Sequence, residues 1–557
     1  MKHNKYICAV LAGAAMLVAS CTDFDDYNEG YTGDGSATST QTLWQNISAN
    51  ENLSEFASLL KKAGYDEKLK GSQFYTVWAP VNGSFGYNDI AVHDSTWLVQ
   101  RFLNSHIANF NYLVSGEVNR RVHTLNEKSF VLAGNIGGCT YASKQMLTMN
   151  QPSLNGTLHT LDGYAEYFPN VYEYIFDVAG CDSLASYFKK YELSYLDKDA
   201  SVEGPIVDGN QTYSDSVMIT ENILLDYAHF GAAIDVEDSS YTMLLPNDDA
   251  FNKAVAAVSP AFNYRDEMPY FDLSTIVTTD VPTKRSITVD AAVLKDSLTK
   301  FAIAQNLMFS NNDGFNKGVF NHSLSVPFDT LRTPAYNKLS NGYEMLSHTV
   351  GEPIQASNGE VRIVDTLAYR PWEVWNPELG FSYVATTYGA TSASTYYNRV
   401  DRWGNVLARY YDVVPQSTST EPHVYYYLNN VRAASYDVYV IFVSGTKPYK
   451  YTVGINYVKS DGTLNEYNAT PPFNVTSLTT DETYQTAPNG LDTCYVGRVT
   501  FPYSYAGLAS SDCAPYLRVQ SARGRLGNDR KNYDNNLKIA GVLLRPVEYD
   551  EYLKKDE

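Results

Sequence analysis

Two short stretches of the chain share one pattern of apolar and polar positions. YTVWAPVNGSF (75–85) and YTMLLPNDDAF (241–251) each run from an apolar segment through Pro and Asn to Phe. An apolar run that stops at Pro predicts a buried strand, because Pro cannot continue the pairing of a sheet. The Asn that follows is expected in a turn or helix cap, and the final Phe is expected to pack the next helix onto the sheet.

Three further pairs of segments recur in the same order, with helical spacing in the first two pairs and an Asn-Gly turn leading into an alternating strand in the third. The pairs are SEFASLLKK (54–62) with DSLASYFKK (182–190), RFLNSHIANFNY (101–112) with KFAIAQNLMFSN (300–311), and NGTLHTLD (155–162) with NGEVRIVD (358–365). Ser54 and Asp182 are expected to cap the first helix of each copy. The sequence therefore predicts a duplicated domain whose second copy carries insertions at 194–240 and 255–295.

The pattern changes after about Trp375 to alternating strands separated by turns. Six segments have this period: HVYYYLNNV, SYDVYVIFV, KYTVGINYV, TCYVGRVTF, PYLRVQSA and LKIAGVLLRPV. Strands of this kind, joined by Asn and Gly turns, favour an antiparallel β-sandwich of jelly-roll type over residues 377–557.

The repeated strand–Pro–Asn–Phe stretch and the repeated Asn-Gly strand resemble conserved segments of the fasciclin (FAS1) family. The resemblance implies two compact α+β wedge domains, at 41–168 and 169–376, that serve adhesion or protein binding and not catalysis. A histidine of the family matches His106, whereas the second copy has Gln305 at that place. No imidazole chemistry shared by both copies is therefore expected. The expected fold class is α+β, with the two wedge domains followed by the all-β sandwich.

The first 21 residues, MKHNKYICAVLAGAAMLVASC, have a basic start and an apolar run too short to span a bilayer. They resemble a lipoprotein signal peptide (1–20) whose lipobox ends at Cys21, which implies a lipid anchor on that cysteine. An ordinary secretory signal is the less favoured alternative. The acidic, Gly- and Ser-rich segment 21–40 is expected to be a flexible tether. Its early aspartates resemble a signal for the outer face of the bacterial outer membrane, where we expect the protein.

The composition of the chain argues against one class of function, nucleic-acid binding, and favours another, binding through tyrosine-rich surfaces. The 557 residues include 62 acidic and 42 basic ones, for a net charge of −20, which argues against nucleic-acid binding through phosphate neutralisation. Tyrosine is twice as frequent as phenylalanine, with 46 residues against 23. Tyr combines an apolar ring with a polar tip and suits strands and half-solvated binding surfaces. The length is too great for one hydrophobic core and predicts several domains.

Aromatic residues gather near the start of the sandwich and are our candidates for sugar stacking: Trp403, Tyr396, Tyr397, Tyr410 and Tyr411. Exposed rings next to polar side chains can stack on sugar faces. The alternative is a structural role, because consecutive tyrosines in a strand place every other ring in the core. The two insertions also mix aromatic and acidic residues on what we expect to be exposed loops, which could provide binding specificity. The alternative is that they are solvent-exposed segments without a binding role.

Four cysteines remain after the expected signal cleavage. Cys494 and Cys513 fall in one C-terminal region and could form a disulfide, which a location outside the cytoplasm permits. Whether Cys139 and Cys181 pair is left open. None of the four has the spacing of a zinc site, so no metal is expected, and no cofactor apart from the lipid.

The sequence has no HExxH, GxSxG or Gly-rich phosphate motif, which argues against a known catalytic class. Glu373, between Trp372 and Trp375, is the one acid flanked by aromatic residues that merits a test, although a place at a domain junction is favoured. The sequence thus predicts a non-catalytic surface lipoprotein that binds extracellular glycan or protein. The alternative is a structural subunit of an outer-membrane nutrient-uptake complex of the starch-utilisation type. A polysaccharide or peptide hydrolase is the least favoured hypothesis.

Overall fold

The computed structural model divides the chain into two compact units, Met1–Phe168 and Pro169–Glu557. We call residues 41–168 the first repeat, 169–376 the second repeat and 377–557 the C-terminal segment. The structure describes residues 39–556 apart from gaps at 208, 277–281, 322–328, 383–385, 389, 393–395, 401–405, 444–446, 466–490, 510–512, 523–526 and 535. The predicted signal peptide, Cys21 and nearly all of the predicted tether lie outside the described residues.

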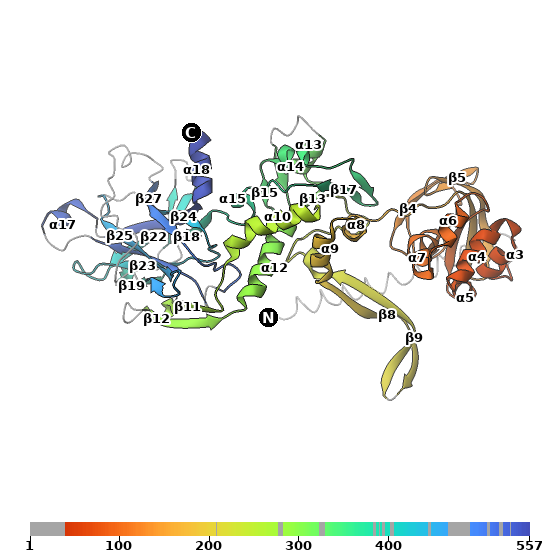
Figure 1. Ribbon diagram of the computed structural model, residues 1–557, viewed down its shortest axis with the longest axis horizontal. Coiled ribbons are helices and arrows are strands. Elements are labelled where there is room, and N and C mark those ends of the chain that lie inside the picture. Colours follow the sequence, from red (N-terminus) through yellow and green to blue (C-terminus); the bar gives the residue numbers. More distant parts are fainter. Residues whose placement is uncertain are drawn as a thin grey trace, which may run out of the picture. The chain divides into compact units, whose positions relative to one another are not determined.

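The first unit is built on a seven-stranded sheet with the strand order β2-β1-β7-β6-β5-β4-β3. Its centre is β1 (Tyr75–Pro80), which pairs in parallel with β7 (Gly156–Asp162), and both strands are almost wholly buried. The other strands are β2 (Ile107–Asn109), β3 (Val118–His123), β4 (Ser129–Asn135), β5 (Gly138–Tyr141) and β6 (Lys144–Ser153). Helices α3 (Leu43–Ala49), α4 (Ser54–Lys62) and α7 (Ser95–Arg101) accompany the sheet (Figure 1).

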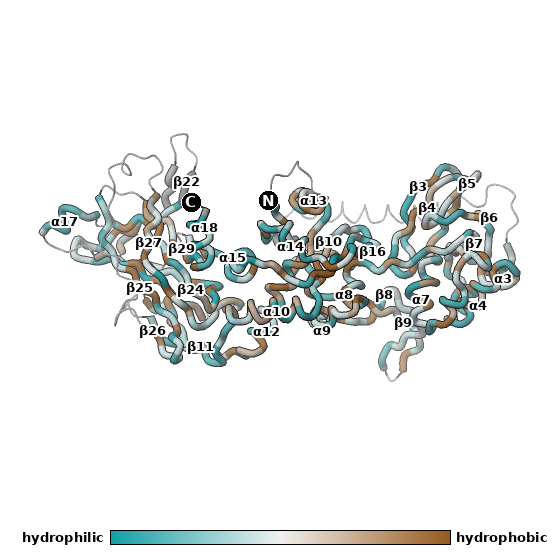
Figure 2. Tube along the Cα trace, turned by 45° about the horizontal axis from the view of Figure 1, so that its top comes forward, coloured by the Kyte–Doolittle hydropathy of each residue, from teal (hydrophilic) through white to brown (hydrophobic). Residues whose placement is uncertain are grey.

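The second repeat reproduces the centre of this arrangement in a four-stranded sheet with the order β13-β10-β17-β16. Its elements are β10 (Tyr241–Pro246), β13 (Met308–Ser310), β16 (Ile354–Ala356), β17 (Gly359–Val364), α8 (Val171–Asp177), α9 (Asp182–Lys189), α10 (Asp248–Val258) and α12 (Ala291–Ala304). Tyr75 pairs with Gly156 in the first repeat, and Tyr241 pairs with Gly359 in the second. The predicted duplication is thus visible as identical strand pairing, and Figure 2 shows hydrophobic residues concentrated around β10.

The Asn-Gly turn does the same structural work in both repeats. Asn155 is buried; its Oδ1 accepts from the amide of Leu43 at 2.8 Å, and its Nδ2 donates to two backbone carbonyls. Asn358 is also buried; its Oδ1 accepts from the amide of Val171 at 2.9 Å, and its Nδ2 donates to the carbonyls of Ile234 and Val236. Each Asn therefore ties the first helix of its repeat to the central strand.

Replacing Asn358 with Ala is expected to destabilise the second repeat by about 3 kcal/mol, because three hydrogen bonds to the backbone are lost at about 1 kcal/mol each. Urea unfolding of the full chain measures the change. Asn312→Ala is the matched control, since Asn312 is exposed and the change there should stay within about 0.5 kcal/mol. Equal effects of the two substitutions would contradict this role of Asn358.

The strand–Pro–Asn–Phe stretch of each repeat (75–85 and 241–251), which we call the corner, has the predicted structure, but the predicted caps of the preceding helices are wrong. Phe85 and Phe251 are buried, and Asn247 caps α10 by accepting from the amide of Ala250 at 2.9 Å. The predicted caps Ser54 and Asp182 are wrong, because both residues lie in the first turn of their helices and neither caps with its side chain.

The missing caps come from the corners themselves. In the first repeat Asn82 Oδ1 accepts from the amide of Glu55 at 3.0 Å, and in the second Asp248 Oδ1 accepts from the amide of Ser183 at 2.6 Å. A side chain far along the sequence thereby satisfies the first free amides of each helix. This explains why the corner recurs in both repeats: it caps the helix that precedes it.

The strand register also corrects the alignment around His106. Ile107 pairs with Val77 in the first repeat, and Met308 pairs with Met243 at the same place in the second. The residue that matches His106 is therefore Leu307, which is buried, and not Gln305. The second repeat still lacks an imidazole at this position, so the expectation about shared chemistry does not change.

The two insertions of the second repeat form two different hairpins. The first contains β8 (Glu192–Val207) and β9 (Asn210–Asn222), which extend away from α8 and α9 (Figure 1). The second contains β11 (Glu267–Asp272) and β12 (Thr283–Thr288).

The second hairpin packs on the C-terminal segment, so the expectation of a wholly exposed loop at 255–295 is wrong. Met268 is part of the core of that segment, and the ring of Phe271 meets Tyr516 edge to face with centroids 5.4 Å apart. Just before the hairpin, Tyr264 donates to the carbonyl of Ala506 at 2.8 Å. The aromatic residues of this insertion join the second repeat to the sandwich.

The C-terminal segment is the predicted antiparallel β-sandwich. One sheet has seven strands, with the path β20-β22-β29-β24-β27 and β18 and β21 added, and the other has five, in the order β19-β23-β28-β25-β26. The six predicted strands are β23 (His423–Tyr427), β24 (Ser435–Val443), β25 (Tyr451–Val458), β27 (Leu491–Thr500), β28 (Tyr516–Ser521) and β29 (Leu537–Pro546). The others are β18 (Leu379–Ser382), β19 (Thr386–Tyr388), β20 (Ala390–Ser392), β21 (Tyr396–Val400), β22 (Val406–Pro415) and β26 (Leu464–Asn465). A helix, α18 (Val547–Asp556), follows β29.

Candidate functional site

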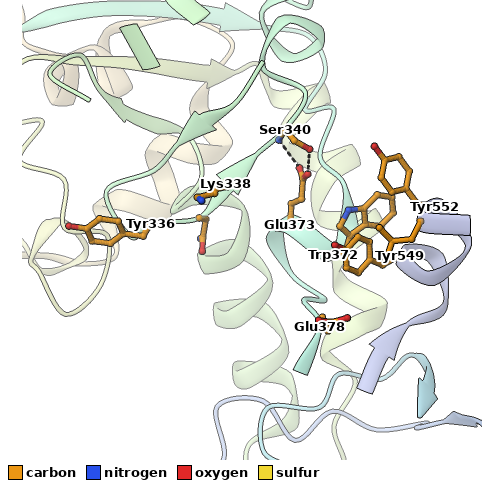
Figure 3. A pocket seen from close by; sticks show the side chains of 10 residues that line it. Tyr336, Lys338, Ser340, Trp372, Glu373, Glu378, Tyr549 and Tyr552 are labelled. Atoms are coloured by element: carbon orange, nitrogen blue, oxygen red, sulfur yellow. Dashed lines mark hydrogen bonds between the residues drawn. The ribbon is translucent and has the colours of Figure 1, made fainter. Parts of the chain in front are cut away.

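A pocket of about 440 Å³ lies in the second unit, where the second repeat meets the C-terminal segment. Three parts of the chain line it: the β15 region, the α15 region and α18 (Figure 3). β15 is Lys338–Leu339 and α15 is Pro371–Val374. The lining residues are Tyr336, Asn337, Lys338, Ser340, Trp372, Glu373, Glu378, Tyr549, Tyr552 and Leu553.

Three aromatic rings form one wall of the pocket. The Trp372 ring stacks on Tyr549 with centroids 5.6 Å apart and 17° between the planes, and it meets Tyr552 at 5.1 Å and 34°. Figure 3 shows the three rings grouped together on one side, with Lys338 and Tyr336 on the other. All three rings are half-buried, so each keeps some surface open to solvent. Such a wall offers a flat apolar surface to a ring-shaped ligand.

The two carboxylates of the pocket are held by donors. Glu373 accepts from both the hydroxyl and the amide of Ser340, and Arg370 lies 3.8 Å from it. Glu378 accepts from Arg545 Nε at 2.6 Å. Glu373 thus lies at the domain junction, as the favoured interpretation predicted, and forms part of a pocket wall there. A carboxylate fixed by several donors is suited to orienting a polar ligand through its remaining acceptor positions.

Helix α18 is fixed to the sandwich by a buried carboxylate. Asp550 accepts from Tyr439 and from Arg545, both at 2.9 Å, and it also pairs with Lys554. Burial alone would raise the pKa of Asp550, but these donors outweigh it and bring the pKa to about 2. The network sets the position of the helix that carries Tyr549 and Tyr552.

The predicted ring cluster of the sandwich is only partly described. Tyr396 and Tyr397 lie in β21, opposite Tyr411 and Tyr410 of β22. Tyr411 is buried and packs in the core of the sandwich, so its predicted role in ligand binding is wrong. The reason is the alternation along the strand, which turns neighbouring side chains to opposite faces. Tyr410 is half-buried, and Trp403 lies outside the described residues.

The four described cysteines are thiols in the structure. Cys494 lies in β27 of one sheet, and Cys513 precedes β28 of the other. The structure contains both as thiols, which contradicts the predicted disulfide between them. Cys139 is buried in the core of the first unit and Cys181 in a core of the second, and both are thiols as well.

His106, which matches the family histidine, has a structural role. It is fully buried; its Nδ1 lies 2.8 Å from the carbonyl of Phe102, and its Nε2 accepts from the amide of Ala165 at 3.0 Å. A second buried imidazole, His159, accepts from the amide of Asn150 and donates to the carbonyl of Tyr112. Burial lowers the pKa of both histidines to about 4. Both rings therefore join backbone segments and are not accessible to a ligand.

The described part of the chain lacks two other kinds of feature. No group of three or more His, Cys, Asp or Glu side chains there is arranged to hold a metal ion. No described helix combines the length and the apolar character that crossing a bilayer requires.

Sequence reasoning identifies Trp372 and Glu373 but misses the residues that complete the pocket. Tyr549 and Tyr552 lie three positions apart in EYDEYLKKDE, a spacing that places two residues on one face of a helix. That spacing is the sequence signal from which a shared helix face for Tyr549 and Tyr552 could have been predicted. Nothing in the sequence indicates that this helix lies against residues near 338 and 372.

Comparison with known proteins finds a family for part of the first unit. The family model of the fasciclin domain matches residues 51–164. This part of the chain is a fasciclin domain. The match covers the β1–β7 pair and the buried histidines but leaves the second repeat outside it, which is fasciclin-like by its strand pairing alone.

Solved structures with weak likeness include a FAS1 domain pair from the insect cell adhesion molecule fasciclin I, at 13% identity, covering 58% of this chain and 98% of that one, with a TM-score of 0.20. A family 35 carbohydrate-binding module from Clostridium thermocellum has 12% identity, covers 30% of this chain and 96% of its own, and has a TM-score of 0.16. The corresponding module from Paenibacillus barcinonensis has 11% identity, coverages of 30% and 98%, and a TM-score of 0.18. No curated protein sequence matches the chain.

Proposed function

We propose that the protein is a non-catalytic binding protein of the cell exterior that recognises an extracellular glycan through the pocket between the second repeat and the sandwich. The observation that carries the proposal is the wall of Trp372, Tyr549 and Tyr552 facing polar groups across a cavity of about 440 Å³. Stacked aromatic surface together with a few polar groups is the combination that a sugar ring requires. The fasciclin domain supports a role in adhesion or binding.

The location belongs to the same proposal. A lipid on Cys21 would anchor the chain in the outer membrane, and the acidic segment 21–40 would hold the domains away from the surface. The support for this step is the sequence of the first 26 residues, with its basic start, short apolar run, small residues before Cys21 and early aspartates.

Loss of one wall residue tests the site. Tyr552→Ala in the full chain is expected to weaken glycan binding about tenfold, which is the size of effect that removal of a central aromatic contact has. A glycan array identifies the ligand, and titration calorimetry gives the affinity. Tyr227→Ala is the matched control, because Tyr227 is 93% exposed and lies outside the pocket.

The same preparation separates binding from catalysis. We expect the bound glycan to be recovered intact after long incubation. Cleavage that disappears in Glu373→Gln would replace the proposal with the hydrolase hypothesis. Failure of every glycan to bind, or equal loss in the Tyr552 and Tyr227 variants, would overturn the assignment of this pocket.

A further inference from the structure

The hairpin formed by the first insertion, residues 192–222, is called the arm here. Its strands β8 and β9 make a two-stranded sheet, and within the described part of the chain neither strand pairs with any other. Figures 1 and 2 both show the arm extending away from helices α8 and α9 of its own unit. Both outer edges of the arm therefore present backbone donors and acceptors that a further strand can use.

The arm has apolar side chains on both faces. Tyr195 pairs with Ile219, and Leu196 pairs with Met218 at the next position, so the two pairs point to opposite faces. Near the base of the arm Leu193, Tyr195 and Met218 are exposed, with Met218 at 56%.

The tip of the arm also has exposed apolar side chains. Ile206 and Val207 are 69% and 52% exposed next to the turn at Gly209. An ordinary surface hairpin places its apolar residues on the one face that packs on a core. The arm shows them at its base and at its tip, with no core beneath either face among the described residues.

A two-stranded ribbon alone is marginally stable in water, and an apolar edge that remains open is a template for pairing with another chain. A structure of this kind gains stability when a third strand covers an edge and buries the apolar side chains. The arm therefore has the features of a docking element.

The negative charge of the arm indicates which kind of partner binds to it. Residues 192–222 contain a single lysine, Lys198, and seven acidic residues: Glu192, Asp197, Asp199, Glu203, Asp208, Asp215 and Glu221. A second copy of the arm would bring the same negative charge, and the whole chain has a net charge of −20. Like charges at an interface are unfavourable, whereas a basic partner gains both affinity and a faster association rate.

We propose that the arm binds an extended, Lys- and Arg-rich segment of a partner protein, which pairs with an edge of the ribbon as a third strand. Backbone hydrogen bonds supply affinity in this mode, and the side chains supply selectivity. The inference stands on the arm alone and does not depend on glycan binding in the pocket.

A synthetic peptide of alternating Lys and Val, about ten residues long, tests the proposal, since strands of that length are common in sheets. The peptide carries a dye, and fluorescence anisotropy measures its binding to the full chain. We expect binding that weakens as salt increases, and no binding of the matching Glu-Val peptide. Hydrogen exchange read by mass spectrometry should show protection of β8 or β9 when the Lys-Val peptide is bound.

Two variants of the chain localise the binding. Replacing residues 194–220 with Asn-Gly closes the hairpin after Leu193 and should abolish peptide binding, because an Asn-Gly turn suits a short hairpin. Asp197→Asn combined with Glu203→Gln keeps the arm and should weaken binding about tenfold. Glu117→Gln combined with Glu352→Gln is the control, because both residues are exposed and lie outside the arm.

Three results would overturn the proposal. The first is that the shortened chain binds the Lys-Val peptide as well as the intact chain does. The second is that the Glu-Val peptide binds equally, which would show adsorption without charge recognition. The third is that sedimentation shows the intact chain to be an oligomer and the shortened chain a monomer, which would make a second copy the occupant.

Discussion

Lowering the pH from 7 to 5 is expected to destabilise the first unit by about 4 kcal/mol. His106 and His159 are buried, and burial lowers the pKa of each from 6.5 to about 4. In the unfolded chain both imidazoles regain the ordinary pKa and take up protons more readily. Their contribution to stability is therefore complete above pH 6.5 and is lost as the pH falls toward 4. At pH 5 each histidine accounts for about 2 kcal/mol of the loss.

The second repeat provides an internal control, because Leu307 matches His106 by strand register and Arg362 occupies the place of His159. Hydrogen exchange read by mass spectrometry gives opening free energies for residues 75–80 and 241–246 in one sample. We expect the first segment to lose stability between pH 7 and 5 and the second to change much less. The same loss in both segments would show that the buried imidazoles are not the cause.

The second large effect is expected at Gly359. Its φ is +150°, and an added Cβ would lie 1.8 Å from the carbonyl oxygen of Tyr241 on the neighbouring strand. Ala at this position must push β10 and β17 apart where they pair at the centre of the sheet. Adding backbone strain to steric overlap, we expect Gly359→Ala to cost about 4 kcal/mol or more in urea unfolding.

Gly351→Ala separates these two causes. Gly351 also has a positive φ, +76°, but an added Cβ there would have no heavy atom within 4 Å and would meet open space. Backbone strain alone should cost about 1 kcal/mol at this position. If both substitutions cost the same, the close approach of the two strands at Gly359 has no energetic importance.

The parts of the fold that are predictable are the ones encoded by neighbouring residues. The run from Tyr75 to Phe85 specifies its own strand, stop and helix, and the Asn-Gly turn before β7 specifies a sharp bend. The six sandwich strands are equally predictable from the sequence, because alternation of apolar and polar residues is a local signal. These elements appear in the structure where the sequence places them.

Predictions fail where a residue works through a distant partner. The cap of α9 is Asp248, from the next corner of the chain, and no pattern near Asp182 reveals it. The insertion at 255–295 resembles an exposed loop because its aromatic residues have no core-facing period. Phe271 is nevertheless buried, against Tyr516 of the sandwich.

The residues of the pocket also fall into those that the local sequence predicts and those that it does not. Glu373 stands out in the sequence because it lies between Trp372 and Trp375, whereas the rest of the aromatic wall comes from α18 near the end of the chain. The prediction for Tyr411 is wrong because sequence alone does not say which member of a tyrosine pair faces the core. A pocket lined by two parts of the chain that are distant in the sequence can be recognised only after their packing is known.

The hairpin β11–β12 has a consequence for anyone who divides this chain into pieces. Leu273 donates its amide to the hydroxyl of Tyr427 at 2.8 Å, and Phe271, Leu273 and Ile276 share a buried cluster with Tyr425 and Tyr516. A fragment cut at residue 377 would leave those two tyrosines uncovered and liable to aggregate. A soluble fragment of the sandwich must therefore carry residues 263–289 with it, and a gene rearrangement that separates the two parts is expected to yield an insoluble product.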